Sequence, residues 1–106
     1  MTSIARVTTD LEDGERWLRV EGELEIDSVP ALQAAVAEAL DAGEGDLVVD
    51  LTATTFVDST GLAGLLAASK EVALHDRRLR VHAPPGHEAR VLLNLTGTGS
   101  MLGVFP

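Results

Sequence analysis

The chain has 106 residues, 45% of them hydrophobic, no cysteine and a formal net charge of −9. This length fits one domain with its own core, and the lack of cysteine excludes disulfides, thiolate metal sites and cysteine nucleophiles. An acidic surface repels phosphate backbones, and one Trp, two Phe and no Tyr offer no stacking platform, so we expect no direct nucleic-acid binding.

The N-terminal residues 1–9 contain Arg6 and no apolar segment typical of a signal peptide. No apolar run reaches the length that a bilayer span requires. We therefore expect no membrane insertion and a cytoplasmic location.

The first elements in chain order are two short strands, predicted at Ile4–Val7 and Arg16–Gly22, with a polar turn at Asp10–Gly14 between them. These strands can pair as a hairpin. A helix follows the linking residues 23–27, with Asp27 or Ser28 as its N-cap. Its first turn accommodates Pro30, and Gly43 and Gly45 end it; its apolar stripe is Val29, Leu32, Val36, Ala39 and Leu40.

A central buried strand is predicted at Leu47–Leu51, and Thr54–Val57 carries the chain onward to a second helix at roughly Ser59–Leu74. Alternation over Leu79–Ala83 predicts another strand, which Pro84, Pro85 and Gly86 end. A short helix at His87–Leu95 then places Val91, Leu92 and Leu95 on one face, and Leu102–Phe105 forms a last strand or a packed tail.

The resulting order is β-β-α-β-α-β-α-β, in a single domain over residues 1–106 with a core at about 4–105. Strands alternating with helices predict an α/β fold with a mixed sheet, mostly parallel after the opening hairpin and covered by helices.

The segment Asp58-Ser59-Thr60-Gly61-Leu62 lies where a strand pattern changes to a helix pattern. Free N–H groups near Gly61 and Leu62 and the positive end of the helix dipole favour a phosphate in such a first turn. These features indicate Ser59 as a candidate regulatory phosphosite. A serine at a helix start is also an ordinary cap residue, and Asp58 could hold the cap or orient the Ser59 hydroxyl.

Four segments together resemble the STAS domains, and more narrowly the bacterial anti-sigma-factor antagonists. They are Gly22–Asp27, Leu47–Thr52, Phe56–Leu62 and Val91–Gly97, and the match in order and spacing runs from about Arg16 to Phe105. The resemblance implies a STAS-type fold and a partner-switching function in transcription regulation. An antagonist of this kind binds an anti-sigma factor that is itself a serine kinase, and thereby frees the sigma factor.

The resemblance also implies the roles of single residues. Phosphorylation falls on Ser59, with Thr60 as a second possible site, and releases the kinase; a serine phosphatase reverses the modification. The family commonly has Asp where this chain has Glu25, so the carboxylate near the phosphosite lies one methylene further out. The partner-binding residues expected from the matched motifs and the second helix are Glu25, Asp58, Thr60, Gly61, Ala63, Gly64 and Ala67.

The second helix is expected to present Ala63, Gly64, Ala67 and Lys70 outward, where a partner could approach the backbone. Glycine inside a helix costs roughly 1 kcal/mol relative to alanine, so Gly64 implies close packing against a partner or against this chain's own sheet.

Other readings have less support. Asp50 and Asp58 could form a general acid/base pair, but a partly solvated acid at a strand end and a capping acid are the more common uses. Asp50 also resembles the phosphoacceptor of response-regulator receivers, but the only lysine, Lys70, lies inside a helix. His75, His82 and His87 lack metal-ligand spacing. We expect no cofactor, no metal and no catalytic activity.

A second functional hypothesis keeps the fold and changes the partner. The chain would then be a STAS accessory subunit of a membrane transport complex, docking on its ATPase component, and phosphorylation need not be involved.

Overall fold

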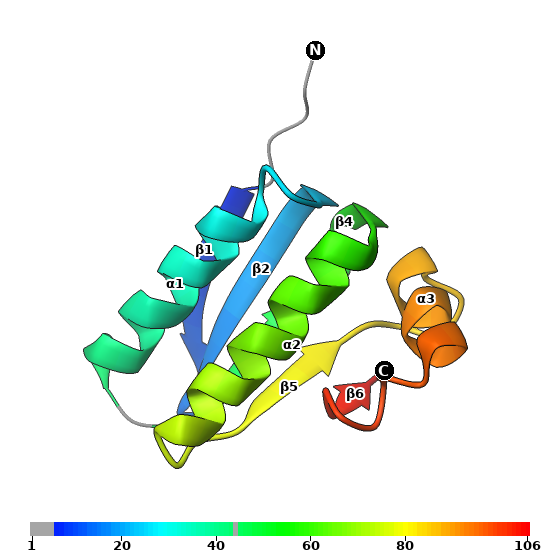
Figure 1. Cartoon of the computed structure of the whole chain (residues 1–106). Helices are drawn as coiled ribbons and strands as arrows, with labels where there is room; N and C mark the ends of the chain where they lie inside the picture. The colour runs from blue at the N-terminus through cyan, green and yellow to red at the C-terminus, as the bar shows by residue number, and fades with distance from the viewer. Residues whose placement is uncertain (1–5, 44) are drawn as a thin grey trace.

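The computed structural model describes residues 6–43 and 45–106, so Ile4 of the first predicted strand lies outside the described residues. In these ranges the chain forms six strands and three helices (Figure 1). They are β1 (Arg6–Glu12), β2 (Glu15–Leu24), α1 (Val29–Ala42), β3 (Leu47–Asp50), β4 (Thr54–Val57), α2 (Ser59–Leu74), β5 (Leu79–His82), α3 (Glu88–Thr96) and β6 (Val104–Phe105).

The strands form one mixed sheet in the order β1-β2-β3-β5-β6, with β4 paired to β2. Only the β1–β2 hairpin is antiparallel among the described pairs, as the sequence predicts. The hairpin turn is shorter than the predicted Asp10–Gly14, because β1 runs to Glu12. Asp13 and Gly14 make the turn with φ of 50° and 79°, and Asp-Gly is a pair that such tight hairpin turns favour.

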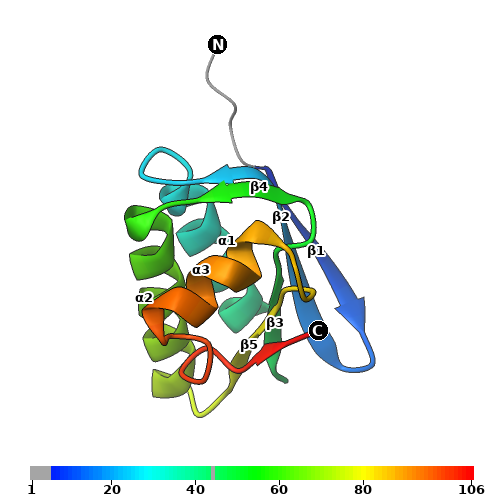
Figure 2. The same cartoon turned by 90° about the vertical axis from the view of Figure 1, so that its right-hand side faces the viewer.

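The predicted element order lacks one strand, β4, which the structure places between β3 and α2. The first half of β2 pairs with β3, whereas Gly22, Glu23 and Leu24 pair with β4, and the register of this second pairing shifts between Gly22 and Glu23. Figure 2 shows β4 beside the end of β2. This arrangement brings the residues before α2 next to the residues before α1.

Helices α1 and α2 pack on one face of the sheet (Figure 1), and their buried faces meet aliphatic side chains of the strands. In α1 the buried residues are Leu32, Ala35, Val36 and Ala39, whereas the predicted stripe members Val29 and Leu40 are half-buried. The core contains no aromatic side chain among the described residues; its most fully buried members include Leu18, Val20, Leu24, Leu47, Val49, Leu51, Leu65, Val72 and Val81.

The third helix buries a different face from the one predicted. Ala89 and Leu93 enter the core, whereas Val91 and Leu95 are 47% and 80% exposed. The helix contacts β4, which the sequence analysis did not identify as a strand, so its inner face could not be assigned correctly. None of the described helices is long and apolar enough to cross a membrane.

Candidate functional site

The start of α2 is capped by the residue before it. Asp58 is the N-cap in an extended conformation, and its Oδ1 accepts a hydrogen bond from the Gly61 N–H at 2.9 Å. The Leu62 N–H donates to the Asp58 carbonyl oxygen at 2.9 Å. Ser59 and Thr60 follow in the first turn with exposed side chains. Asp58, and not Ser59, therefore holds the cap.

The amides predicted to receive a phosphate are already engaged in this arrangement. The Gly61 N–H donates to the Asp58 side chain, and the Leu62 N–H makes the first bond of the helix. A phosphate on Ser59 would therefore stand at the surface beside the Asp58 carboxylate, instead of entering the cap.

The cap also fixes the charge of Asp58. Hydrogen bonds from the Gly61 N–H and from Thr60 hold the pKa of the Asp58 carboxyl below its usual range, although partial burial acts in the opposite direction. Asp58 consequently carries a full negative charge at neutral pH, one position before the exposed Ser59.

The end of β2 and the start of α1 lie against the first two turns of α2. The Asp58 N–H donates to the Leu24 carbonyl oxygen at 3.4 Å, and a Cβ added at Gly61 would come within 2.2 Å of that oxygen. A Cβ at Gly64 would lie 3.1 Å from the methyl groups of Val29. Both glycines therefore allow the close approach of this chain's own segments.

A buried serine organises the β2–α1 loop. The Ser28 hydroxyl accepts from the Glu25 N–H at 2.9 Å and donates to the Glu23 carbonyl oxygen at 2.7 Å. The Glu25 carbonyl oxygen accepts from the N–H groups of Ser28 and Val29. These bonds fix the backbone of Glu25, which is half-buried, at the start of the loop. Ser28 is thus the N-cap residue of α1 by position, but its side chain bonds to the loop and makes no hydrogen bond to the first turn of the helix.

The predicted partner-binding residues separate into three groups by burial. Glu25 and Asp58 are half-buried, and Thr60, Ala63 and Ala67 are exposed. Gly61 and Gly64 are buried. The prediction that Gly64 faces outward is wrong, because the close packing that a helical glycine implies is with Val29 of α1.

Sequence reasoning missed two exposed apolar side chains near Ser59. Ile26 in the β2–α1 loop is 65% exposed, and Phe56 in β4 is 46% exposed. The available signal was a large apolar residue inside an otherwise acidic loop and another in a short strand just before the serine.

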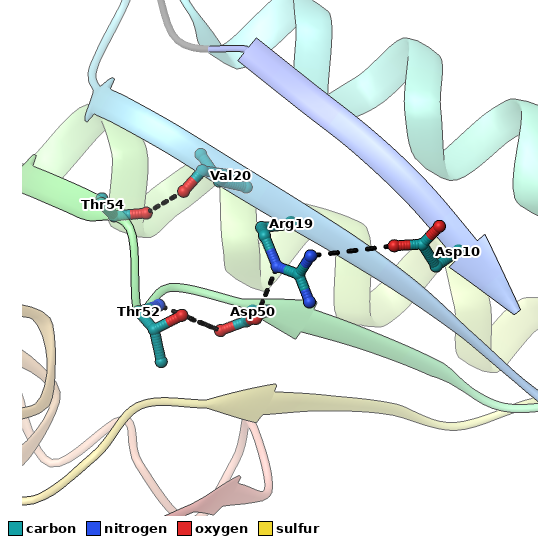
Figure 3. Close-up of polar contacts among 6 residues, drawn as sticks. All are labelled: Asp10, Arg19, Val20, Asp50, Thr52 and Thr54. Atoms are coloured by element: carbon teal, nitrogen blue, oxygen red, sulfur yellow. Dashed lines mark hydrogen bonds and ion pairs between the residues drawn. The ribbon is translucent and has the colours of Figure 1, made fainter. Parts of the chain in front are cut away.

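The second carboxylate of the region is part of a different network (Figure 3). Asp50 is 3% exposed and accepts from Arg19 Nε at 3.1 Å and from the Thr52 N–H and hydroxyl at 3.0 and 2.8 Å. Burial alone would raise the pKa of this carboxyl, but the bonds from Thr52 and Arg19 bring it below the usual range. The expectation of a partly solvated Asp50 is therefore wrong.

The three histidines serve separate local contacts. His75 Nδ1 lies 3.0 Å from the Glu71 carbonyl oxygen, and His87 Nδ1 accepts from the Ala89 N–H. The His82 ring packs against Trp17 and Phe105, with centroids 5.6 and 5.0 Å away, and these two rings also contact each other. Across the described part of the chain no cluster of three or more potential metal ligands occurs.

A family model described as "Mlab, STAS domain" matches residues 7–103. The chain belongs to the STAS-domain family. The resemblance on which the sequence analysis rests is thereby confirmed, as is the α/β fold class. No curated protein matches the chain significantly.

Solved structures of this STAS protein's fold include several anti-sigma factor antagonists. One from Mycobacterium paratuberculosis is 26% identical with a TM-score of 0.81, and the match covers 96% of this chain and 86% of that one. A putative antagonist from Thermotoga maritima is 19% identical with a TM-score of 0.78, covering 94% and 86%. The Bacillus cell fate determinant SpoIIAA in its phosphorylated form is 17% identical with a TM-score of 0.68, covering 95% and 92%. The last two show similarity of fold.

Proposed function

We propose that this STAS protein is an anti-sigma-factor antagonist that binds a serine-kinase anti-sigma factor and releases it when Ser59 is phosphorylated. The observation that carries the proposal is the exposed Ser59 beside Asp58, at the start of α2, in a domain similar to known antagonists. A serine phosphatase would restore the binding form. The chain acts as a binding module in the cytoplasm and has no catalytic activity of its own.

The local geometry explains how a phosphate could switch binding without unfolding the domain. Phosphorylation adds about −1.5 to −2 charges and three acceptor oxygens. Because Asp58 already caps α2, the helix needs no contribution from Ser59, and the modified side chain remains at the surface. The change is then confined to whatever protein covers Ser59. Thr60 is exposed as well and is a second candidate for modification.

The proposal is tested by recovering partners from the native lysate with wild-type, Ser59→Ala and Ser59→Asp baits, and with Thr60→Ala as a matched neighbour. We expect wild type, Ser59→Ala and Thr60→Ala to recover a kinase-like protein and Ser59→Asp to lose it. Equal recovery by Ser59→Ala and Ser59→Asp contradicts the switch.

A second candidate is the accessory subunit of a membrane transport complex that docks on an ATPase component. The exposed Ile26 and Phe56 suit an ATPase partner as well as a kinase, because apolar docking at this surface requires no phosphate. Recovery of a transporter ATPase by all four baits would support this candidate and contradict the first.

A further inference from the structure

Two large exposed apolar side chains lie on the segments that lead into α1 and α2, at the end of the molecule where α2 begins with Ser59. We propose that the residues Glu25, Ile26, Asp27, Phe56 and Ser59, the junction surface, dock a basic protein surface with apolar pockets for Ile26 and Phe56. In this account a phosphate on Ser59 expels the partner because it cannot be desolvated there, and charge repulsion is not the cause. The inference rests on the proposed function and names the chemistry of its partner.

The backbone places these residues together. The loop that carries Glu25, Ile26 and Asp27 lies between Leu24, which contacts Asp58 and Gly61, and Val29, which contacts Gly64. The loop therefore runs beside the first turn of α2. Phe56 is next to Glu23 on the β2–β4 ladder, and Ser59 follows it by three positions. Both views show the β2–α1 loop and the β4–α2 junction at the same end of the molecule (Figures 1 and 2).

The apolar side chains suit an interface centre. Ile26 and Phe56 expose 65% and 46% of their surface, although residues of these types are usually buried. Interface energy concentrates in a few apolar or aromatic side chains that fill pockets, with polar residues around them. The bonds of Ser28 to Glu23 and Glu25 hold the Ile26 loop in one conformation, which lowers the entropy lost on binding.

The charge around them indicates the sign of the partner. Glu25 and Asp27 lie on the loop and Asp58 beside the serine, whereas residues 20–29 and 54–64 contain no Lys or Arg. The neighbouring Arg6 stands opposite Glu21 in the hairpin, and Arg19 is bound to Asp50. A basic surface complements this arrangement and would associate faster at low ionic strength.

This charge pattern constrains how phosphorylation can act. Against a basic partner, extra negative charge on Ser59 strengthens the long-range attraction. Loss of binding must then arise at short range, where closing an apolar contact over the phosphate removes its water without supplying matching donors. Such an effect persists at high salt, whereas repulsion between charges is screened.

The test measures binding of the purified kinase recovered by the Ser59→Ala bait. Ile26→Ser and Phe56→Ser should each weaken binding about tenfold or more. Leu74→Ser and Leu95→Ser are the matched controls, because these leucines are 79% and 80% exposed and lie outside the junction surface. Their affinity should change less than about twofold. Thermal unfolding of each variant confirms that the domain remains folded.

Charge is tested on the same kinase. Glu25→Gln and Asp27→Asn should slow association at about 0.05 M NaCl and have little effect at about 0.5 M, unlike Glu38→Gln on the exposed face of α1. Phosphorylated wild type should be weaker than unphosphorylated wild type at both salt concentrations. The factor should be at least as large at about 0.5 M NaCl, because salt screens the attraction that the added charge contributes.

Three results overturn the inference. They are junction variants that behave like Leu74→Ser, association that is unaffected by Glu25→Gln and Asp27→Asn, or a phosphorylation effect that fades at high salt. Each of these leaves the Ser59 switch intact. Recovery of no kinase, or equal binding by Ser59→Ala and Ser59→Asp, defeats the proposed function itself and this inference with it.

Discussion

Asp50 and Asp58 stand eight positions apart, and hydrogen bonds lower the pKa of both carboxyls. The Asp50 side chain accepts hydrogen bonds from Thr52 and Arg19 and is almost inaccessible to water. Asp58 caps a helix beside an exposed serine. A lowered pKa is thus common to both, and the difference lies in what stands next to the carboxylate. Asp50 holds the β3–β4 turn, whereas Asp58 holds the candidate switch.

Removal of the Asp50 carboxylate should cause the largest loss of folding stability. Asp50→Ala removes the buried carboxylate that accepts from the Thr52 N–H, the Thr52 hydroxyl and Arg19 Nε, and we expect a loss of about 2–3 kcal/mol in the free energy of unfolding. Urea denaturation measures it. The control is Asp10→Ala, whose carboxylate lies 3.7 Å from Arg19 and is 61% exposed, so it should cost less than about 0.5 kcal/mol. Equal losses in the two variants would contradict the buried network.

Gly61→Ala should destabilise the start of α2, where Asp58 is the N-cap. Its Cβ would meet the Leu24 carbonyl oxygen, which is backbone and cannot rotate away. We expect a loss of about 1–3 kcal/mol in urea denaturation despite the better helix propensity of alanine. In Gly64→Ala the Cβ meets the Val29 methyl groups at 3.1 Å, and small movements can relieve that contact. Gly64→Ala should therefore be clearly the milder change; the reverse order would contradict the described packing of the α2 start.

Lowering the pH should reduce the folding stability that the Asp50 and Asp58 carboxylates contribute. This effect should be smaller than that of the substitutions above. The folded pKa values of both carboxyls lie below the ordinary 3.8, so the stability they contribute is fully present above that value and is lost as the pH falls through the folded pKa. Asp58→Asn keeps an acceptor at the cap but does not titrate. Its stability should fall less steeply than that of wild type from about pH 5 to about pH 3, as measured by urea denaturation. An identical slope would mean that Asp58 has an ordinary pKa.

The sequence predicts much of this site because its signals are local. The bounds of α2 and the capping ability of Asp58 follow from a polar residue before a helical stripe, and both agree with the structure. The parallel sheet after the hairpin also follows from the alternation of elements.

The errors arise where tertiary contacts decide. The four residues of β4 include only one buried side chain, so their pattern does not predict a strand. The strand forms because it pairs with the end of β2. Gly64 was placed outward because nothing local reveals Val29. The sequence predicts a partly solvated Asp50 because its partner Arg19, 31 positions away, is not apparent locally. Ile26 and Phe56 were missed because exposure of an apolar residue is a property of the folded surface.

The central claim is that Ser59 is the switch, and phosphotransfer tests it most directly. The purified chain is incubated with ATP and the kinase that it recovers, the modified residue is mapped by mass spectrometry, and kinase affinity is measured before and after. The account predicts a phosphate on Ser59, none on the Ser59→Ala variant, unchanged thermal stability and at least about a tenfold loss of affinity. Stoichiometric phosphorylation with unchanged affinity, or phosphate confined to another residue, would contradict it.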